Sequence, residues 1–201
     1  MHEPVSPDMA DRLELWDYRR RVADIYSDVR SGGREELTWR RWVRRRDELF
    51  GTHPQTPLEH PESFTGLPYF DHDPTWRTVA RFVASAEEPW GEFLRIGTLQ
   101  FELRTVASSL PLFWLNVYGG GVFVPFRDRT NGTSTYGGGR YLLDTVKGAD
   151  LGQEGASVIL DFNYSYHPSC VHSDRWACPL APLASDLQYE VTAGERLAET
   201  T

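Results

Sequence analysis

Residues 99 to 104 read LQFELR, and this short stretch decides the fold class of the chain. Its apolar residues Leu99, Phe101 and Leu103 alternate with polar ones, a period of two that is typical of a β-strand with one buried face. Similar patterns predict further strands at 78–83, 112–117, 122–126, 141–146, 158–162 and 187–191. Because turn sequences rather than helical patterns separate these strands, they predict an antiparallel β-sandwich or barrel.

The hydrophobic period before this region is that of helices. An apolar stripe at spacings of three and four spans residues 15–29, with Ser6-Pro7 as its predicted start and Gly32-Gly33 as its end. A second helix is predicted from about Arg34 to Phe50. Its basic run WRRWVRRR, residues 39–46, is interpreted as a solvated face, with a docking patch for an acidic partner as the alternative.

The length of 201 residues is enough for one domain with its own hydrophobic core. We predict a single domain of the α+β class, mainly β, in which two N-terminal helices pack on the antiparallel β-sandwich or barrel. Its parts are a helical extension at 1–50, a proline-rich packed segment at 51–75 that crosses the sheet, and a β core at 76–196.

Composition argues against several classes of partner. A formal net charge of −8 repels phosphates, so neither nucleic acid nor an anionic membrane is expected as a partner. No stretch approaches the ~20 apolar residues of a membrane span and no signal peptide is evident, which predicts a cytoplasmic protein. The two cysteines are expected to be free thiols, with a disulfide as the alternative. The expected partners are a small-molecule ligand and, as an option, a second copy in a homodimer.

A glycine-rich stretch, VPFRDRTNGTSTYGGGRYL at 124–142, supplies the first group of candidate site residues. Its arginines, aspartate and tyrosine offer charge and hydrogen bonds, and its glycines allow a close approach of the backbone to a ligand. The stretch lacks the order of strand, glycines and helix found in nucleotide-binding loops. The alternative is a hairpin tip with a structural Arg–Asp pair. The candidates are Arg127, Asp128, Tyr136, Gly138 and Arg140.

A second polar stretch, DFNYSYHPSC at 161–170, follows a predicted buried strand. Asp161 could orient a base or accept from an arginine, and Asn163 could donate to a developing oxyanion. Alternatively, both residues only cap the turn that follows. Tyr166 is a further candidate ligand contact, and Cys170 a candidate nucleophile.

Histidine and cysteine occur here with the spacing H-x2-C-x-H-x5-C, formed by His167, Cys170, His172 and Cys178. These residue types bind zinc, but the spacing fits no common zinc module, so we predict neither a metal nor a cofactor. A cysteine nucleophile activated by a neighbouring histidine is another hypothesis.

Several motifs occur together in one order: HPQTPL at 53–58, FTGLPYF at 64–70, FVPFRDRTNGTSTYGGGRYL at 123–142, DFNYSYHPSC at 161–170, CPLAP at 178–182 and AGE at 193–195. In these motifs the chain, from about residue 40 to 196, resembles the bacterial and archaeal family called domain of unknown function 1684. The family has no established reaction, so the resemblance implies a shared site rather than a shared activity. His167 and His172 stand where the family usually has asparagine and an aromatic residue, which argues against a family-wide zinc site. Ser185-Asp186 replaces the usual Glu-Asn.

Two functional hypotheses follow. We favour an enzyme acting on a small carboxylate- or phosphate-bearing metabolite, with the arginines of the first stretch binding the anion. Asp161 or Asp128 would act as or orient a base, and Tyr136 or Cys170 would complete the chemistry. The alternative is a ligand pocket without turnover, or a structural network of the same groups. Both predict that the two polar stretches meet, with Arg140 beside Asp128 or Asp161. An unpaired buried aspartate in an open pocket would favour the enzyme.

Overall fold

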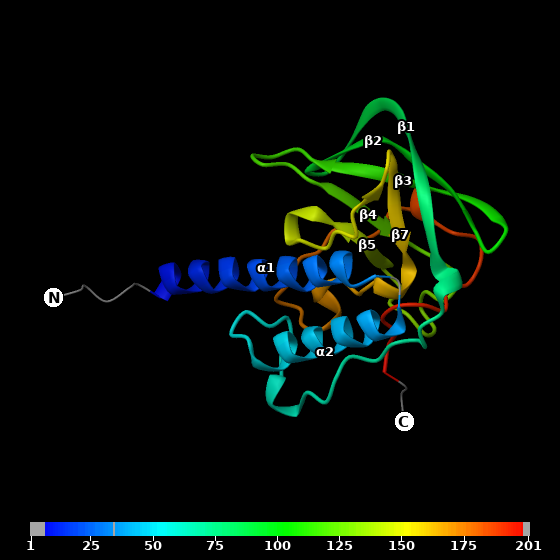
Figure 1. Cartoon of the computed structure of the whole chain (residues 1–201). Helices are drawn as coiled ribbons and strands as arrows, with labels where there is room; N and C mark the ends of the chain where they lie inside the picture. The colour runs from blue at the N-terminus through cyan, green and yellow to red at the C-terminus, as the bar shows by residue number, and fades with distance from the viewer. Residues whose placement is uncertain (1–6, 34, 199–201) are drawn as a thin grey trace.

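The computed structural model describes residues 7–33 and 35–198, in which two helices precede a curled antiparallel sheet (Figure 1). The elements are α1 (Pro7–Gly32), α2 (Glu36–Thr52), β1 (Arg77–Trp90), β2 (Phe93–Leu103), β3 (Val106–Leu115), β4 (Val122–Phe126), β5 (Arg140–Asp144), β6 (Gln153–Glu154) and β7 (Ser157–Asp161). The predicted α+β class is therefore confirmed, and the sheet curls into a half-barrel. Ser6 and Arg34, the predicted helix starts, lie outside the described residues.

The two helices lie side by side and run in opposite directions (Figure 1). Gly33, with a φ of +80°, lets the chain leave α1, and the Thr38 hydroxyl donates to the Gly32 carbonyl at 2.8 Å, which satisfies a terminal acceptor of that helix. Their buried apolar side chains are Ile25, Tyr26, Val29, Trp42, Leu49 and Phe50. Over the described ranges, neither helix has the length and apolar content that crossing a bilayer requires.

The sheet has the strand order β5-β4-β3-β2-β1-β7-β6, and every neighbouring pair is antiparallel. β1 pairs with β7 through Arg77–Ala80 and with β2 through the rest of its length, so it joins the two halves of the sheet. Register shifts interrupt the β1–β2, β2–β3 and β4–β5 ladders. Such irregularities bend strands and increase their twist, which accounts for the curl.

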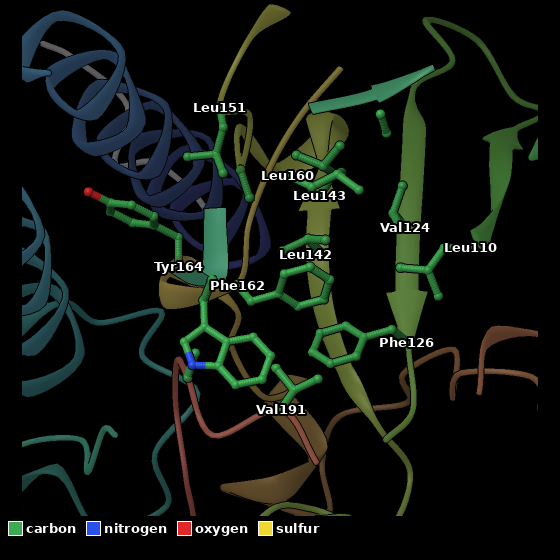
Figure 2. Close-up of a cluster of buried hydrophobic side chains, with 14 of the residues drawn as sticks. Leu110, Val124, Phe126, Leu142, Leu143, Leu151, Leu160, Phe162, Tyr164 and Val191 are labelled. Atoms are coloured by element: carbon green, nitrogen blue, oxygen red, sulfur yellow. The ribbon is translucent and has the colours of Figure 1, made fainter. Parts of the chain in front are cut away.

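One hydrophobic core fills the space between the helix pair and the sheet (Figure 2). Its centre consists of side chains that are fully buried: Leu110, Val124, Phe126, Leu142, Leu160, Phe162 and Val191. They come from β3, β4, β5, β7 and the C-terminal segment, so the core ties the end of the chain to the sheet. Burial of this apolar surface is the main favourable contribution to folding.

The proline-rich segment 51–75, predicted to pack across the sheet, makes contacts with α2. The Leu67 backbone N–H donates to Asp47 Oδ1 at 3.0 Å, and the rings of Phe64 and Phe50 lie 6.4 Å apart. These contacts fix the segment to the C-terminal half of α2.

The predicted strand at 187–191 is wrong. The Leu187 N–H donates to the Arg127 carbonyl at 2.9 Å, which starts a pairing, but the Val191 N–H donates to the Asp128 side chain at 3.2 Å. The next backbone bond, from the Arg129 N–H to the Tyr189 carbonyl at 3.1 Å, is out of register with the first, so no ladder forms. The apolar pattern of this segment reflects burial in an irregular conformation.

Candidate functional site

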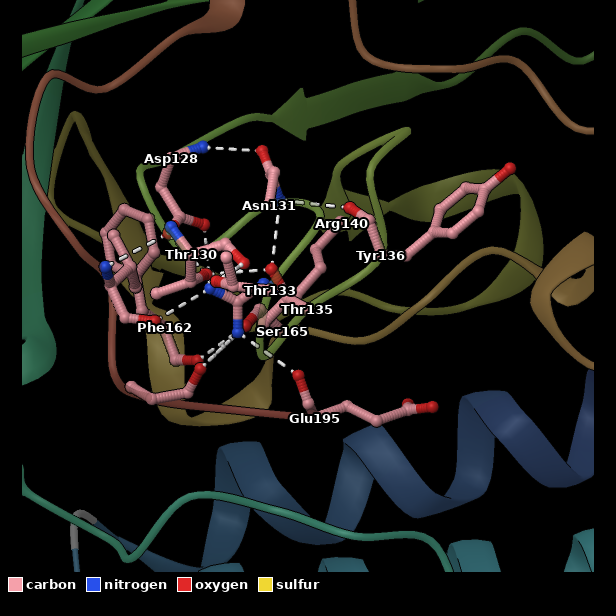
Figure 3. A network of polar contacts seen from close by, with 12 residues as sticks. Asp128, Thr130, Asn131, Thr133, Thr135, Tyr136, Arg140, Phe162, Ser165 and Glu195 are labelled. Carbon is pink, nitrogen blue, oxygen red and sulfur yellow. Dashed lines mark hydrogen bonds and ion pairs between the residues drawn. The ribbon is translucent and has the colours of Figure 1, made fainter. Parts of the chain in front are cut away.

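Arg140 and Asp128 form a buried ion pair beside the C-terminal segment (Figure 3). Arg140 Nη2 lies 2.9 Å from Asp128 Oδ2, and both side chains are 0% exposed. The guanidinium also donates to the carbonyls of Val191 at 2.8 Å, Glu195 at 3.2 Å, and Ala193. Only Nε of this guanidinium has no hydrogen-bond partner among the described residues. The buried ion pair therefore connects β5, the loop after β4 and the end of the chain.

The other carboxylate oxygen of the pair, Asp128 Oδ1, accepts hydrogen bonds from within the loop at 128–139. Asp128 Oδ1 accepts from the Thr130 N–H at 2.8 Å and from the Thr130 hydroxyl. Asn131 Nδ2 donates to the Tyr136 carbonyl at 3.1 Å, so the loop holds its own shape (Figure 3). Gly139 has a φ of +91°, and a Cβ there would lie 2.5 Å from a backbone oxygen of β4. Both carboxylate oxygens are occupied, and the network is of the closed kind that favours a structural role.

Asp161 and Asn163 lie apart from this pair and cap the turn after β7. Asp161 Oδ1 accepts from the Asn163 N–H at 3.1 Å and from its Nδ2 at 2.9 Å. The Asn163 side chain also bonds both backbone groups of Asp73, at 2.9 and 3.1 Å. Burial raises the pKa of Asp161. The prediction that Arg140 lies beside Asp128 or Asp161 is thus confirmed for the first of the two.

The remaining candidates connect the two polar stretches. The Tyr141 N–H donates to the Tyr166 carbonyl at 2.8 Å, so the stretches converge as predicted. The Gly138 carbonyl accepts from the Ala181 N–H at 3.0 Å, and Arg127 is half-buried with its backbone paired to residues 185–187.

Tyr136, Cys170 and Cys178 form a separate, half-buried group. No disulfide joins Cys170 and Cys178 in the structure. Burial and the neighbouring Cys178 thiol raise the pKa of Cys170, which lowers the fraction of reactive thiolate. The Tyr136 N–H donates to His167 Nε2 at 3.2 Å, so this ring nitrogen is occupied. No trio of His, Cys, Asp or Glu in the described part of the chain could hold a metal ion.

A cavity of about 260 Å³ opens between α1, α2 and the segment 166–178. Its wall is mainly aliphatic and aromatic. Among the residues that line it are Leu15, Tyr18, Val22, Leu49, Phe50 and Trp176. Of the predicted catalytic and ligand-binding residues, Tyr166 lies on this wall, as do His167 and Cys178 of the histidine and cysteine group, so sequence reasoning missed most of it. Helical periodicity had marked several of these residues as inward-facing, but it does not distinguish a packed core from a cavity.

A second buried ion pair lies at the floor of the cavity. Arg46 Nη1 and Nη2 are each 3.0 Å from Glu195 Oε2, and the guanidinium packs over four aromatic rings at 4.8–5.9 Å from their centroids. Burial alone would raise the pKa of Glu195. The charge of Arg46 and contacts with His167 and His172 instead lower this pKa well below its ordinary value. The interpretation of the basic run as a solvated face is therefore wrong at Arg46.

Polar groups make up a minor part of the surface of the cavity wall. The Tyr26 hydroxyl is buried and has no hydrogen-bond partner among the described residues, and burial raises the pKa of Tyr18 to about 12. Lys147 lies 3.5 Å from Asp144, whereas Arg19 is exposed and forms no ion pair within the described ranges. None of the described residues of the wall is Asp or Glu.

The fold and these two buried ion pairs define a class of α+β protein in which a helix pair covers a half-barrel and shares a cavity with it. A family model described as protein of unknown function (DUF1684) matches residues 62–196, and the chain belongs to this family. No curated protein matches significantly. The solution NMR structure of the uncharacterized protein from gene locus rrnAC0354 of Haloarcula marismortui is similar, with 36% identity and a TM-score of 0.57. The match covers 77% of this chain and 90% of the Haloarcula chain.

Proposed function

We propose that this protein binds a small molecule that joins an apolar body to one anionic group, and that the cavity between α1 and α2 holds it. The observation that carries the proposal is the charge of the wall. Arg19 and Lys147 lie on it and none of its described residues is acidic, although the whole chain has a net charge of −8. Cations that line a cleft concentrate anionic ligands there.

The size and lining of the cavity support a small ligand with an apolar body. Ligand sites are mostly apolar, with few polar groups, and typically measure about 300–1,000 Å³. At about 260 Å³ the cavity is slightly smaller than this range, which suits a small ligand.

This proposal places binding away from the group of arginines, aspartates, tyrosine and cysteine predicted from sequence. The Arg140–Asp128 pair has no exposed surface with which to meet a ligand. Binding without turnover is also better supported than catalysis, because the wall offers no carboxylate base. Its one imidazole, His167, has Nε2 bonded to a backbone N–H and Nδ1 at 3.4 Å from Glu195.

The test uses octanoate and octanol, which differ in charge but share an apolar chain. Isothermal titration should detect saturable binding of octanoate and weaker binding of octanol. Arg19→Gln should weaken octanoate binding about tenfold, which corresponds to about 1.4 kcal/mol. The control Arg12→Gln removes the same charge from an exposed position on α1, outside the cavity lining, and should leave the affinity unchanged. Equal octanoate affinity in the two variants would contradict the proposal.

A second pair of variants tests the location. Leu15 lines the cavity, whereas Leu13 is exposed on the same helix and does not. Leu15→Trp should obstruct the cavity and reduce octanoate binding, and Leu13→Trp should not. Octanoate binding that survives Leu15→Trp unchanged would place the ligand elsewhere.

A further inference from the structure

A second, more open cavity of about 520 Å³ adjoins the first. It lies between the β1–β2 turn, the ends of β3 and β4, and the residues that follow β5. Four residues line both cavities: Arg19, Lys147, Ala177 and Cys178. The two cavities therefore adjoin at these four residues, here called the waist, and the two cations of the proposed anion site are among them.

The two cavities differ in chemistry on either side of the waist. The first has a mainly aliphatic and aromatic wall contributed by the helices. The second is lined by a group of aromatic rings, in which Trp90 lies 5.4 Å from Phe93 and 6.5 Å from Phe123, the latter nearly parallel at 9°. Trp90 and Phe93 are only half-buried, so their rings are accessible to a ligand. Partly exposed aromatic rings favour stacking or edge contacts with another ring.

The second cavity also carries two carboxylates, but neither opposes an anion at the waist directly. Asp144 lies 3.5 Å from Lys147, which compensates its charge, and Glu92 is exposed at the turn between β1 and β2. Arg19 forms no ion pair among the described residues, so it is the cation that is available to an anion here.

We infer that the two cavities form one bipartite site for an anionic amphiphile whose carboxylate or phosphate separates an aliphatic chain from an aromatic ring. The chain occupies the helix cavity, the anion lies between Arg19 and Lys147, and the ring packs on Trp90. This inference rests on the proposed function and adds the class of ligand. It requires that the two apolar parts reinforce one another, because joining two binding groups makes the second contact intramolecular.

The experiment compares three probes on the full chain: octanoate, N-acetylphenylalanine and N-octanoylphenylalanine, in which the carboxylate lies between chain and ring. The joined probe should bind at least about tenfold more tightly than octanoate, a difference of about 1.4 kcal/mol. Trp90→Ala should remove this gain, and Trp90→Phe should restore most of it. The control is Trp114→Ala. Trp114 neighbours Leu115 on β3 but points to the other face of the sheet, so its removal should leave the gain intact.

Octanoate binding tests the helix cavity alone, so it distinguishes a failure of the proposed function from a failure of the bipartite site. If octanoate binds but the joined probe gains nothing, the bipartite site is wrong and the proposed function stands. A gain that persists in Trp90→Ala also overturns the inference, because the ring then lies elsewhere. If octanoate does not bind at all, the proposed function fails and the inference fails with it.

Discussion

Replacing Arg140 by methionine should destabilise the protein strongly. The substitution keeps an apolar stem of similar length but removes the partner of Asp128, whose carboxylate is 0% exposed. It also removes the donors to three carbonyls, those of Val191, Ala193 and Glu195. Water cannot easily replace these donors, because Arg140 is itself fully buried.

The magnitude follows from these contacts. Breaking a buried ion pair by removing one partner costs about 3–5 kcal/mol, because an uncompensated charge remains. The orphaned carbonyls add to this cost, at about 1 kcal/mol each. Packing of the methionine offsets part of it, so we expect a loss of about 4 kcal/mol or more. Domains are typically stable by only about 5–15 kcal/mol, and the variant should therefore be close to unfolding at room temperature.

Urea unfolding followed by circular dichroism measures this loss. Arg129→Met is the matched control. Arg129 lies in the same loop as Asp128, but its side chain is about half exposed, and its guanidinium comes no closer than 3.7 Å to the Asp186 carboxylate. An exposed pair of this kind contributes about 0.2–1 kcal/mol. Adding Asp128→Asn to Arg140→Met should recover part of the loss, because it removes the unpaired charge. A loss below about 1 kcal/mol in Arg140→Met, with an unchanged urea dependence, would refute the structural role.

Three further predictions follow from the same contacts. The pKa of Glu195 is lowered in the folded state, so the ionised carboxylate stabilises the fold above its ordinary pKa of 4.5, and this stabilisation is lost as the pH falls below that value. The difference in unfolding free energy between wild type and Glu195→Gln should therefore shrink in acid. A difference that stays constant with pH would contradict the ion pair. Octanoate should slow the alkylation of Cys178, which lines both cavities, but not that of Cys170. Mass spectrometry of iodoacetamide-treated protein measures both rates. Equal protection of the two cysteines would argue against octanoate binding in the cavity. Gly194→Ala should lower the unfolding free energy by at least about 2 kcal/mol, because the φ of Gly194 is +77° and a Cβ there would lie 2.1 Å from a neighbouring hydroxyl. Gly155→Ala is the control: its φ is +60° but the space around it is open, so the same urea assay should show a smaller loss.

Much of the fold could be predicted from local patterns. The alternation at 99–104 identifies the strand that becomes the end of β2, and the apolar stripe at 15–29 identifies the buried face of α1. The same reasoning failed at 187–191, whose apolar residues are buried without a strand partner. Periodicity reports which side chains are buried, but the partner of each backbone N–H depends on residues far away in the sequence.

The candidate site was only partly predictable. The Arg140–Asp128 pair could be expected, because two charged residues beside apolar strands need compensation when they are buried. Arg46 was missed because it stands among four other arginines in the run 39–46. A signal for it was present: Arg46 lies three residues after Val43 and three before Leu49, on the apolar stripe of α2. Its partner Glu195 is 149 residues distant, and no local pattern could have joined the two.

The cavity combines two walls of different origin, and this has a consequence for related proteins. The segment 166–178 and Glu195 lie within the residues that the family model matches, 62–196, whereas α1 and α2 precede them. A buried carboxylate without a cation costs several kcal/mol or becomes protonated. A relative that buries a glutamate at the position of Glu195 would therefore either place a cation beside it, as α2 does here with Arg46, or keep the carboxyl group protonated. Arg19, the proposed anion contact, is under no such constraint, since it forms no ion pair among the described residues. The buried pair thus helps to fix how α2 docks, while the proposed anion contact on α1 is free to vary.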